Sequence, residues 1–256
     1  MQDKDNNIIY GVHAVLAALK DSPTLIEKVY IREGLANKDM PIVYNTCKSN
    51  RIPISIIPTD HKMTDIAGPV NHQGLIAIMR DFNYMDIADM LNTIQVNRNN
   101  NKKNLIVIMD EIEDPHNVGA IIRTAVAVGA TGIIVPKHRQ APISGAVYKA
   151  STGLVTSIPI TRISNIGTAI EKLKANNVWV AALNMSSLDT KSKSLWETDM
   201  SGDIAIIVGN EGKGVGKHNA SNSDLIMYIP MDSKVESLNA SVSAAICMYE
   251  WKRQNG

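Results

Sequence analysis

Apolar and polar positions alternate along the first 80 residues with two different periods. Apolar residues at helical spacing predict helices, and short runs of mainly apolar residues predict strands. We expect helices near residues 12–19 and 39–49, and strands at 28–31, 54–57 and 75–79. Residues 1–80 are therefore predicted to form a small α/β domain.

The segment that follows this predicted domain ends in a polar stretch at residues 97–104. This stretch has the sequence NRNNNKKN, which lacks apolar residues and is rich in residues that favour loops. We therefore interpret residues 81–104 as a linker, with a second domain over residues 105–256.

Short and almost continuously apolar runs recur from residue 105 onward. They predict strands at residues 105–109, 132–135, 158–161, 178–182, 204–208 and 225–229. Helical patterns lie near 118–128 and 166–175, and a closing helix is expected from about Asn239 to Trp251. Apolar strands that alternate with helices are typical of a parallel sheet covered on both faces. We predict an α/β fold with a mostly parallel sheet, in which ligands bind at the C-terminal edge of the strands.

Composition narrows the class of protein. The chain has 256 residues, of which 45% are apolar and 20% charged, so it can bury a substantial core. No apolar run reaches the roughly 18 residues that a membrane span needs, and the polar start MQDKDNN does not resemble a signal peptide. We expect a cytoplasmic protein.

Cysteine, histidine and charge patterns give few further signals. Cys47 and Cys247 lie far apart and the histidines are scattered, so neither a disulfide framework nor a metal site is expected. A formal net charge of +1 does not by itself indicate a nucleic-acid partner, but it is compatible with a local basic face.

The loop after the predicted strand 105–109 contains the first candidate site residues. Asn117 is a plausible N-cap for the helix that follows. Arg123 lies among apolar residues of that helix, where an unpaired guanidinium would be costly. We therefore expect Arg123 to have an anionic partner or to point into a site. The alternative is a simple cap and a solvated surface charge.

The loop after strand 204–208 is rich in glycine. Its sequence GNEGKGVGKH begins at Gly209 and contains four glycines, which allow the backbone to approach a ligand closely. No Gly-Lys pair precedes Ser or Thr, so a phosphate-binding Walker loop is excluded. The late position of the loop disfavours a Rossmann dinucleotide site. Glu211 is either a surface turn residue or part of a site.

The third loop joins the strand that ends at Ile229 to the closing helix. Pro230 ends the strand because proline has no backbone donor for the sheet. Ser237 and Asn239 can each cap the following helix. The loop therefore brings polar groups to the edge of the sheet where we expect a ligand.

Together, these loops resemble the three ordered motifs of the SpoU/TrmH family of RNA ribose 2′-O-methyltransferases. The matching residues are NVG at 117–119 with Arg123, IVGNEG at 207–212, and IPM at 229–231 with SLNAS at 237–241. The segment IYGVHAV at 9–15 is also similar to the start of that family's substrate-binding domain, in the branch that methylates a guanosine of 23S rRNA.

The resemblance implies a knotted C-terminal methyltransferase domain, S-adenosylmethionine as the methyl donor, an RNA substrate and a homodimer with the closing helix near its interface. That helix begins with small residues over 240–245, which would permit close approach of a partner. The implied cofactor-binding residues are Gly209, Ile229, Met231 and Leu238. The implied active-site residues are Asn117, Arg123, Glu211, Ser237 and Asn239.

Several alternatives remain at this point. Within the enzyme class, the substrate is 23S rRNA, another rRNA site or tRNA. Outside it, the chain is an RNA-binding protein without catalysis or a dinucleotide-dependent oxidoreductase. The family resemblance offers arginine as a general base. A guanidinium keeps its proton at neutral pH. We therefore favour a protonated Arg123 that binds a phosphate and stabilises the negative charge on the 2′-oxygen.

Overall fold

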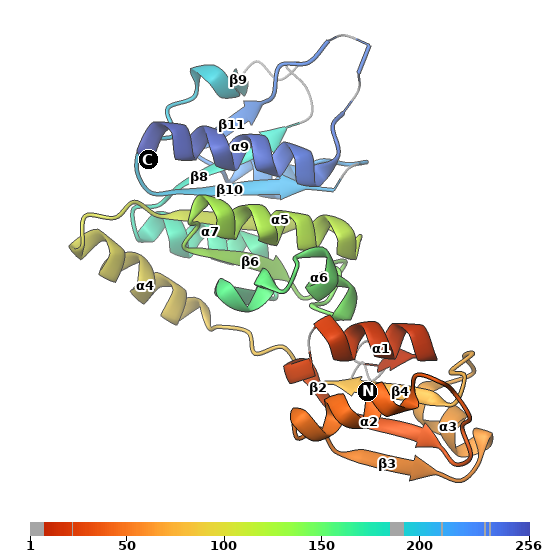
Figure 1. Ribbon diagram of the computed structural model, residues 1–256. Helices are drawn as coiled ribbons and strands as arrows, with labels where there is room; N and C mark the ends of the chain where they lie inside the picture. Colours follow the sequence, from red (N-terminus) through yellow and green to blue (C-terminus); the bar gives the residue numbers. More distant parts are fainter. Residues whose placement is uncertain (1–7, 22, 185–191, 211, 233, 236) are drawn as a thin grey trace. The chain divides into compact units, whose positions relative to one another are not determined.

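The computed structural model describes residues 8–21, 23–184, 192–210, 212–232, 234–235 and 237–256. The chain forms two compact units (Figure 1). The first comprises residues up to 82 together with 142–149, and the second comprises 83–141 and 150–256.

The first unit is built on a four-stranded sheet with the order β1-β4-β2-β3. β2 and β3 are parallel, and the other neighbours are antiparallel. The elements are β1 (Ile8–Tyr10), α1 (Val12–Asp21), a 3₁₀ turn (Pro23–Leu25), β2 (Ile26–Arg32), α2 (Met40–Ser49), β3 (Ile54–Ile57), α3 (Asp60–Ala67) and β4 (Leu75–Met79). Val15, Val29 and Val43 are fully buried between the sheet and its helices. The predicted α/β domain is confirmed.

Besides the 3₁₀ turn, two of these elements of the first unit were not predicted. β1 is a three-residue strand, and α3 has the polar sequence DHKMTDIA, in which only Met63 is buried. A helix with one buried residue leaves almost no periodic apolar pattern. Its start is fixed by Thr59, whose hydroxyl accepts a hydrogen bond from the backbone N–H of Lys62 at 3.4 Å.

The second unit contains a seven-stranded sheet with the order β7-β6-β5-β10-β8-β11-β9. Every neighbouring pair is parallel, so the predicted parallel sheet is confirmed. The strands are β5 (Leu105–Asp110), β6 (Gly132–Pro136), β7 (Ile160–Ile163), β8 (Trp179–Asn184), β9 (Ser192–Ser194), β10 (Ile204–Gly209) and β11 (Leu225–Tyr228). β9, with the sequence SKS, was not predicted because it is a polar edge strand.

Helices cover both faces of this sheet (Figure 1). The remaining elements of this unit are α4 (Ile87–Asn99), α5 (Pro115–Val128), a 3₁₀ turn (Leu154–Ser157), α7 (Ile166–Ala175), a 3₁₀ turn (Leu195–Glu197), α8 (Lys217–Ser221) and α9 (Ala240–Asn255), whereas α6 (Gly145–Ala150) belongs almost entirely to the first unit. Alternate residues of β5, Ile106 and Ile108, pack in one core cluster with α4 and α7. α5 and α9 pack against each other on the opposite face.

The expectation of a linker over residues 81–104 was wrong for most of that segment. α4 inserts Met90 and Ile94, both fully buried, into the core of the second unit. Asn104 is also fully buried. Its Oδ1 accepts hydrogen bonds from Asn97 Nδ2 at 2.8 Å and Thr131 Oγ1 at 2.9 Å. A polar residue can be buried when its hydrogen bonds are satisfied, and this is why polarity alone misplaced the boundary.

Both cysteines are free and buried, as expected for core thiols. Burial raises the pKa of the Cys247 thiol to about 12, and the nearby Glu250 carboxylate adds to the effect. Burial also raises the pKa of Cys47. Among the described helices, none is both long enough and apolar enough to span a bilayer.

Candidate functional site

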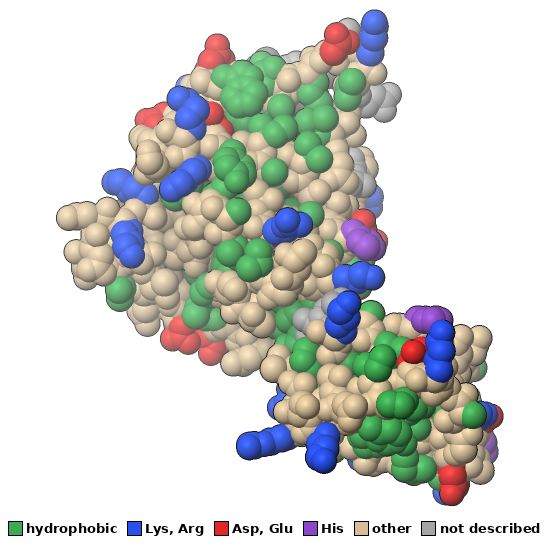
Figure 2. Space-filling view, viewed as in Figure 1, with side chains coloured by type: hydrophobic (Ala, Val, Ile, Leu, Met, Phe, Trp, Pro, Cys, Tyr) green, Lys and Arg blue, Asp and Glu red, His purple; other side chains and the backbone are tan. Residues whose placement is uncertain are grey.

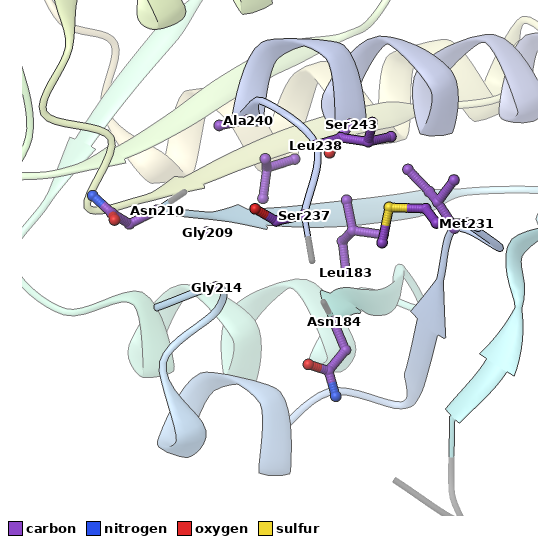
Figure 3. A pocket seen from close by; sticks show the side chains of 12 residues that line it. Leu183, Asn184, Gly209, Asn210, Gly214, Met231, Ser237, Leu238, Ala240 and Ser243 are labelled. Carbon is purple, nitrogen blue, oxygen red and sulfur yellow. The ribbon is translucent and has the colours of Figure 1, made fainter. Parts of the chain in front are cut away.

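A pocket lies at the C-terminal edge of the parallel sheet, where a ligand site was predicted (Figure 3). It is formed by the ends of β8 and β10, the loops that follow β10 and β11, and the start of α9. Its lining residues are Leu183, Asn184, Val208, Gly209, Asn210, Gly214, Ile229, Met231, Ser237, Leu238, Ala240 and Ser243. All four predicted cofactor-binding residues and the predicted catalytic residue Ser237 are in this set.

The glycine-rich loop turns back tightly against the end of β10. The backbone N–H of Gly214 donates to the carbonyl oxygen of Asn210 at 2.7 Å, and Gly214 has a positive φ of 66°. A Cβ atom at Gly209 would lie 2.0 Å from the carbonyl carbon of Gly214. Because real Cβ contacts are never this short, only glycine at 209 permits this loop.

Asp110, at the end of β5, holds the same loop from the other side. This buried carboxylate accepts hydrogen bonds at Oδ2 from the backbone N–H of Gly216 and from Asn219 Nδ2, both at 2.9 Å. Asn210 adds a third tie, since its Nδ2 donates to the carbonyl oxygen of Glu111 at 3.1 Å. Asp110 and Asn219 were not identified from the sequence, because their partners are about a hundred residues away.

Asn239 connects the third loop to the first. Its Oδ1 caps α9 by accepting from the backbone N–H groups of Ser241 at 3.0 Å and Val242 at 3.3 Å. Its Nδ2 donates to Oδ1 of the buried Asn117 at 3.0 Å. The start of α9 and the first turn of α5, which both carry predicted catalytic residues, are therefore joined by a side-chain hydrogen bond across 122 sequence positions.

Asn117 is not the cap that the sequence suggested. α5 begins two residues earlier, at Pro115, and its N-cap is Asp114, whose side chain accepts from the backbone N–H of His116 at 2.9 Å. Proline is favoured at the first helical position because it has no N–H to satisfy. Asn117 therefore lies within the first turn, where its side chain is available to Asn239.

Arg123 is exposed on α5. Its neighbours Ile121 and Ile122 are fully buried, so they face the core while Arg123 faces solvent. With the residues that the structure describes, Arg123 forms no hydrogen bond or ion pair, and the expected anionic partner is not found among them. It does not line the pocket. Glu211, predicted as a catalytic residue, lies outside the described residues.

Small residues of α9 serve mainly to pack this helix within its own chain. Ala240 and Ala244 are buried, and α9 lies against α5. The exposed face of α9 instead carries Val242 and Tyr249, whose exposed fractions are 46% and 55%, with the partly buried Ile246 between them. This stripe, and not Ala240 or Ala244, is the apolar surface that α9 leaves exposed.

The pocket has an apolar lining with a few polar groups and no charged side chain among its described lining residues. Val208, Ile229 and Leu238 provide apolar surface, while Ser237 and Asn184 provide hydrogen-bonding groups. Such a lining is typical of sites for small organic ligands. Clusters of three potential metal-ligating side chains do not occur within the described ranges.

Comparisons with known proteins also divide the chain into two parts. The model of the SpoU rRNA methylase family matches residues 104–249. A second model, of the RNA 2′-O ribose methyltransferase substrate-binding domain, matches residues 8–85. A putative TrmH family tRNA/rRNA methyltransferase, YacO of Bacillus subtilis, is 33% identical over 98% of this chain and 97% of its own length.

Solved structures show the same fold. The AdoMet-bound rRNA methyltransferase of Sinorhizobium meliloti matches with a TM-score of 0.62 and 22% identity, over 98% of this chain and 88% of that chain. The SpoU methyltransferase AviRb of Streptomyces viridochromogenes, in complex with AdoMet, matches with a TM-score of 0.64 and 21% identity, over 96% and 89%. The chain belongs to the SpoU family of RNA methyltransferases and carries that family's RNA substrate-binding domain at its N-terminus.

Proposed function

We propose that this chain transfers a methyl group from S-adenosylmethionine to a ribose 2′-hydroxyl of RNA in the cytoplasm, and that the target is a guanosine of 23S rRNA. One observation carries the proposal. Gly209, Ile229, Met231 and Leu238, which the family motifs assign to the cofactor, line a single pocket at the C-terminal edge of the sheet. The two structural relatives described above were solved with AdoMet.

The lining residues of the pocket fit this cofactor in their chemistry. Glycine at 209 lets the backbone of Gly214 lie against the end of β10, and the pocket wall is largely backbone and apolar side chain. Gly209, Ile229 and Leu238 would hold the cofactor through backbone groups, with Met231 against its apolar parts. When bound, S-adenosylmethionine supplies an electrophilic methyl group on a positively charged sulfur.

The protein's own residues would orient the RNA and manage charge. The exposed guanidinium of Arg123 is free to bind a phosphate of the RNA and to stabilise the negative charge that develops on the 2′-oxygen. The hydrogen bond between Asn117 and Asn239 would fix the start of α9 relative to the first turn of α5. Ser237, in the pocket wall, would hydrogen-bond near the reacting groups. We assign Glu211 an orienting role from the motif alone.

An Arg123→Lys variant tests the role of the guanidinium. Lysine keeps the charge but cannot form the planar pair of hydrogen bonds to a phosphate. We expect methyl transfer to fall sharply while the affinity for S-adenosylmethionine, measured by calorimetry, is unchanged. Full activity in this variant would contradict the bidentate role.

The homodimer is a second part of the proposal. The stripe formed by Val242, Ile246 and Tyr249 on α9 is apolar, and α9 starts beside the pocket. A second copy that covers this stripe would remove it from water. Sedimentation should show a dimer for the native chain and a monomer for Tyr249→Glu.

The target nucleotide is tested in cells that lack this protein. Mapping of 2′-O-methyl groups should show one guanosine of 23S rRNA that has lost its methyl group and regains it when the gene is restored. Loss from a tRNA would support the alternative that the name of the Bacillus subtilis relative leaves open. An unchanged methylation map would favour an RNA-binding protein without catalysis.

A further inference from the structure

A groove lies at the opposite edge of the seven-stranded sheet from the cofactor pocket. It is lined by Arg98, Asn101, Lys102, Lys103, Asn177, Trp179, Ser201, Gly202 and Asp203. These residues come from the end of α4 and from the loops that precede β5, β8 and β10. Trp179 is the first residue of β8 and Asn184 the last, so the groove and the pocket are roughly 17 Å apart at about 3.3 Å per strand residue.

The groove carries an excess of positive charge. Among the described lining residues, Asp203 is the one that is acidic, and its carboxylate is already paired with Arg98 and with the backbone N–H of Asn104, the latter at 2.7 Å. The net charge of the lining is therefore +2, from three cationic residues, Arg98, Lys102 and Lys103, and one carboxylate, Asp203. Lys102 and Lys103 are exposed and form no ion pair with described residues.

The basic residues at this edge have a partial structural explanation. α4 and α7 end here, and the C-terminus of a helix favours nearby cations. Arg98 lies in the last turn of α4 and fulfils that role. Lys102 and Lys103 lie beyond the C-cap Asn100, so they are less effective in this role and remain available to a ligand. Figure 2 shows Lys and Arg side chains gathered at the edge of the second unit where α4 and α9 end.

Trp179 is the feature that the helix ends do not explain. Its side chain is 58% exposed at the start of a central strand, although its backbone is fixed by a hydrogen bond from its N–H to the carbonyl oxygen of Asp203 at 3.0 Å. An exposed indole on a rigid strand next to unpaired lysines can stack on a base while the lysines contact phosphates. This combination matches a single-stranded nucleic acid, in which a flat base and a charged phosphate recur in each nucleotide.

We propose that this groove binds a single-stranded segment of the RNA substrate, with a base stacked on Trp179 and the backbone phosphates on Lys102 and Lys103. The inference rests on the proposed RNA substrate but concerns a region remote from the methyl donor. It provides a second anchor, which increases affinity for RNA and leaves the cofactor pocket unchanged.

Fluorescence anisotropy with a labelled, unstructured RNA of mixed sequence and the full-length protein tests the stacking contact. Trp179→Ala should weaken binding by about 5-fold or more, whereas Trp179→Phe should retain most of the affinity. The matched control is Trp196→Ala, because Trp196 is 55% exposed in the same unit and should leave the affinity unchanged.

The phosphate contacts are tested by salt dependence. The Lys102→Ala, Lys103→Ala double variant should lower the slope of log K against log salt by about 1.4, at about 0.7 per phosphate contact with single-stranded RNA. Lys193→Ala, at an exposed position on β9, is the control and should leave the slope unchanged. All variants should bind S-adenosylmethionine as tightly as the native protein.

Equal RNA affinity for Trp179→Ala and Trp196→Ala, with an unchanged slope for the lysine variant, would overturn the inference. A change in sedimentation without a change in RNA affinity would also overturn it and would assign the groove to a second copy. If the variants behave as expected but no RNA accepts a methyl group, the groove stands and the proposed function fails.

Discussion

At residue 209, even the side chain of alanine would overlap the backbone of Gly214, 2.0 Å away. We predict that Gly209→Ala displaces the glycine-rich loop and reduces the affinity for S-adenosylmethionine at least about 100-fold, equivalent to about 3 kcal/mol. Calorimetric titration measures this loss. Gly212→Ala is the matched control, because a Cβ there meets only Asn210 Oδ1 at 3.6 Å and should bind normally. Equal affinity of the two variants would contradict the proposed pocket.

Asn239 has two separable roles, as the cap of α9 and as the donor to Asn117. Asn239→Ala removes both and should lower the free energy of unfolding by about 0.5–2 kcal/mol. Asn239→Ser restores a cap but not the donor, so it should recover most of the stability and still have a reduced kcat/KM. Urea unfolding and methyl-transfer assays separate the two effects. Full activity of the serine variant would show that the bond to Asn117 is dispensable.

Individual site residues were predictable where the motif itself carries the chemistry. Gly209, Ile229, Met231 and Leu238 were assigned from short motifs and lie in one pocket. Asp110 was missed because its role depends on hydrogen bonds to residues 216 and 219, which only the fold brings near. The apolar residues on either side of Arg123 suggested that its side chain has an anionic partner or points into a site. A helix places successive residues on different faces, however, and Arg123 is exposed.

Among the elements, α4 shows the limit of reasoning from polarity. The buried strands of the parallel sheet were predictable because they are almost continuously apolar. α4 has only Met90 and Ile94 buried, and the polar sequence after it hides a buried Asn104. The polar edge strand β9 had no apolar pattern to detect.

The packing of α4 predicts where the second unit can be cut. A fragment of residues 83–256 should be soluble and fold cooperatively, because it retains α4 over the core. A fragment of residues 105–256 lacks Met90 and Ile94 and should aggregate or lose several kcal/mol of stability. Thermal unfolding followed by circular dichroism compares the two. Equal stability would show that α4 is a dispensable linker after all.

At the scale of the whole molecule, hydrogen bonds from the last turns of α9 hold this helix to the segment that precedes β10. Gln254 Oε1 accepts from the backbone N–H of Met200 at 2.8 Å, and Trp251 Nε1 donates to the carbonyl oxygen of Gly202 at 3.1 Å. Glu250 has a side chain only 5% exposed and accepts from Arg253 and Gln254, both at 2.7 Å. The hydrogen bond from Arg253 is the main cause that lowers the pKa of Glu250 below its usual 4.5.

This network predicts a pH dependence of stability. Because the folded-state pKa of Glu250 is depressed, its contribution is present at neutral pH and is lost as the pH falls through that lowered value. Glu250→Gln should reduce the free energy of unfolding by about 1–2 kcal/mol at pH 7. The difference from the native protein should narrow in acid. Urea unfolding at pH 7 and in acid measures this difference in the free energy of unfolding, and Glu197→Gln, at an exposed position, is the control. A difference independent of pH would rule out this ionic contribution.

The trefoil knot and the homodimer stay predictions from the family, whereas the two-unit α/β architecture and the family itself are established. The central claim is that this chain methylates a ribose 2′-oxygen of RNA. The most direct measurement incubates the purified protein with methyl-labelled S-adenosylmethionine and RNA from cells that lack it, followed by nucleoside mass spectrometry. We predict label in 2′-O-methylguanosine and none with Gly209→Ala. Label on a base, or no transfer to any RNA by a protein that binds the cofactor, would contradict it.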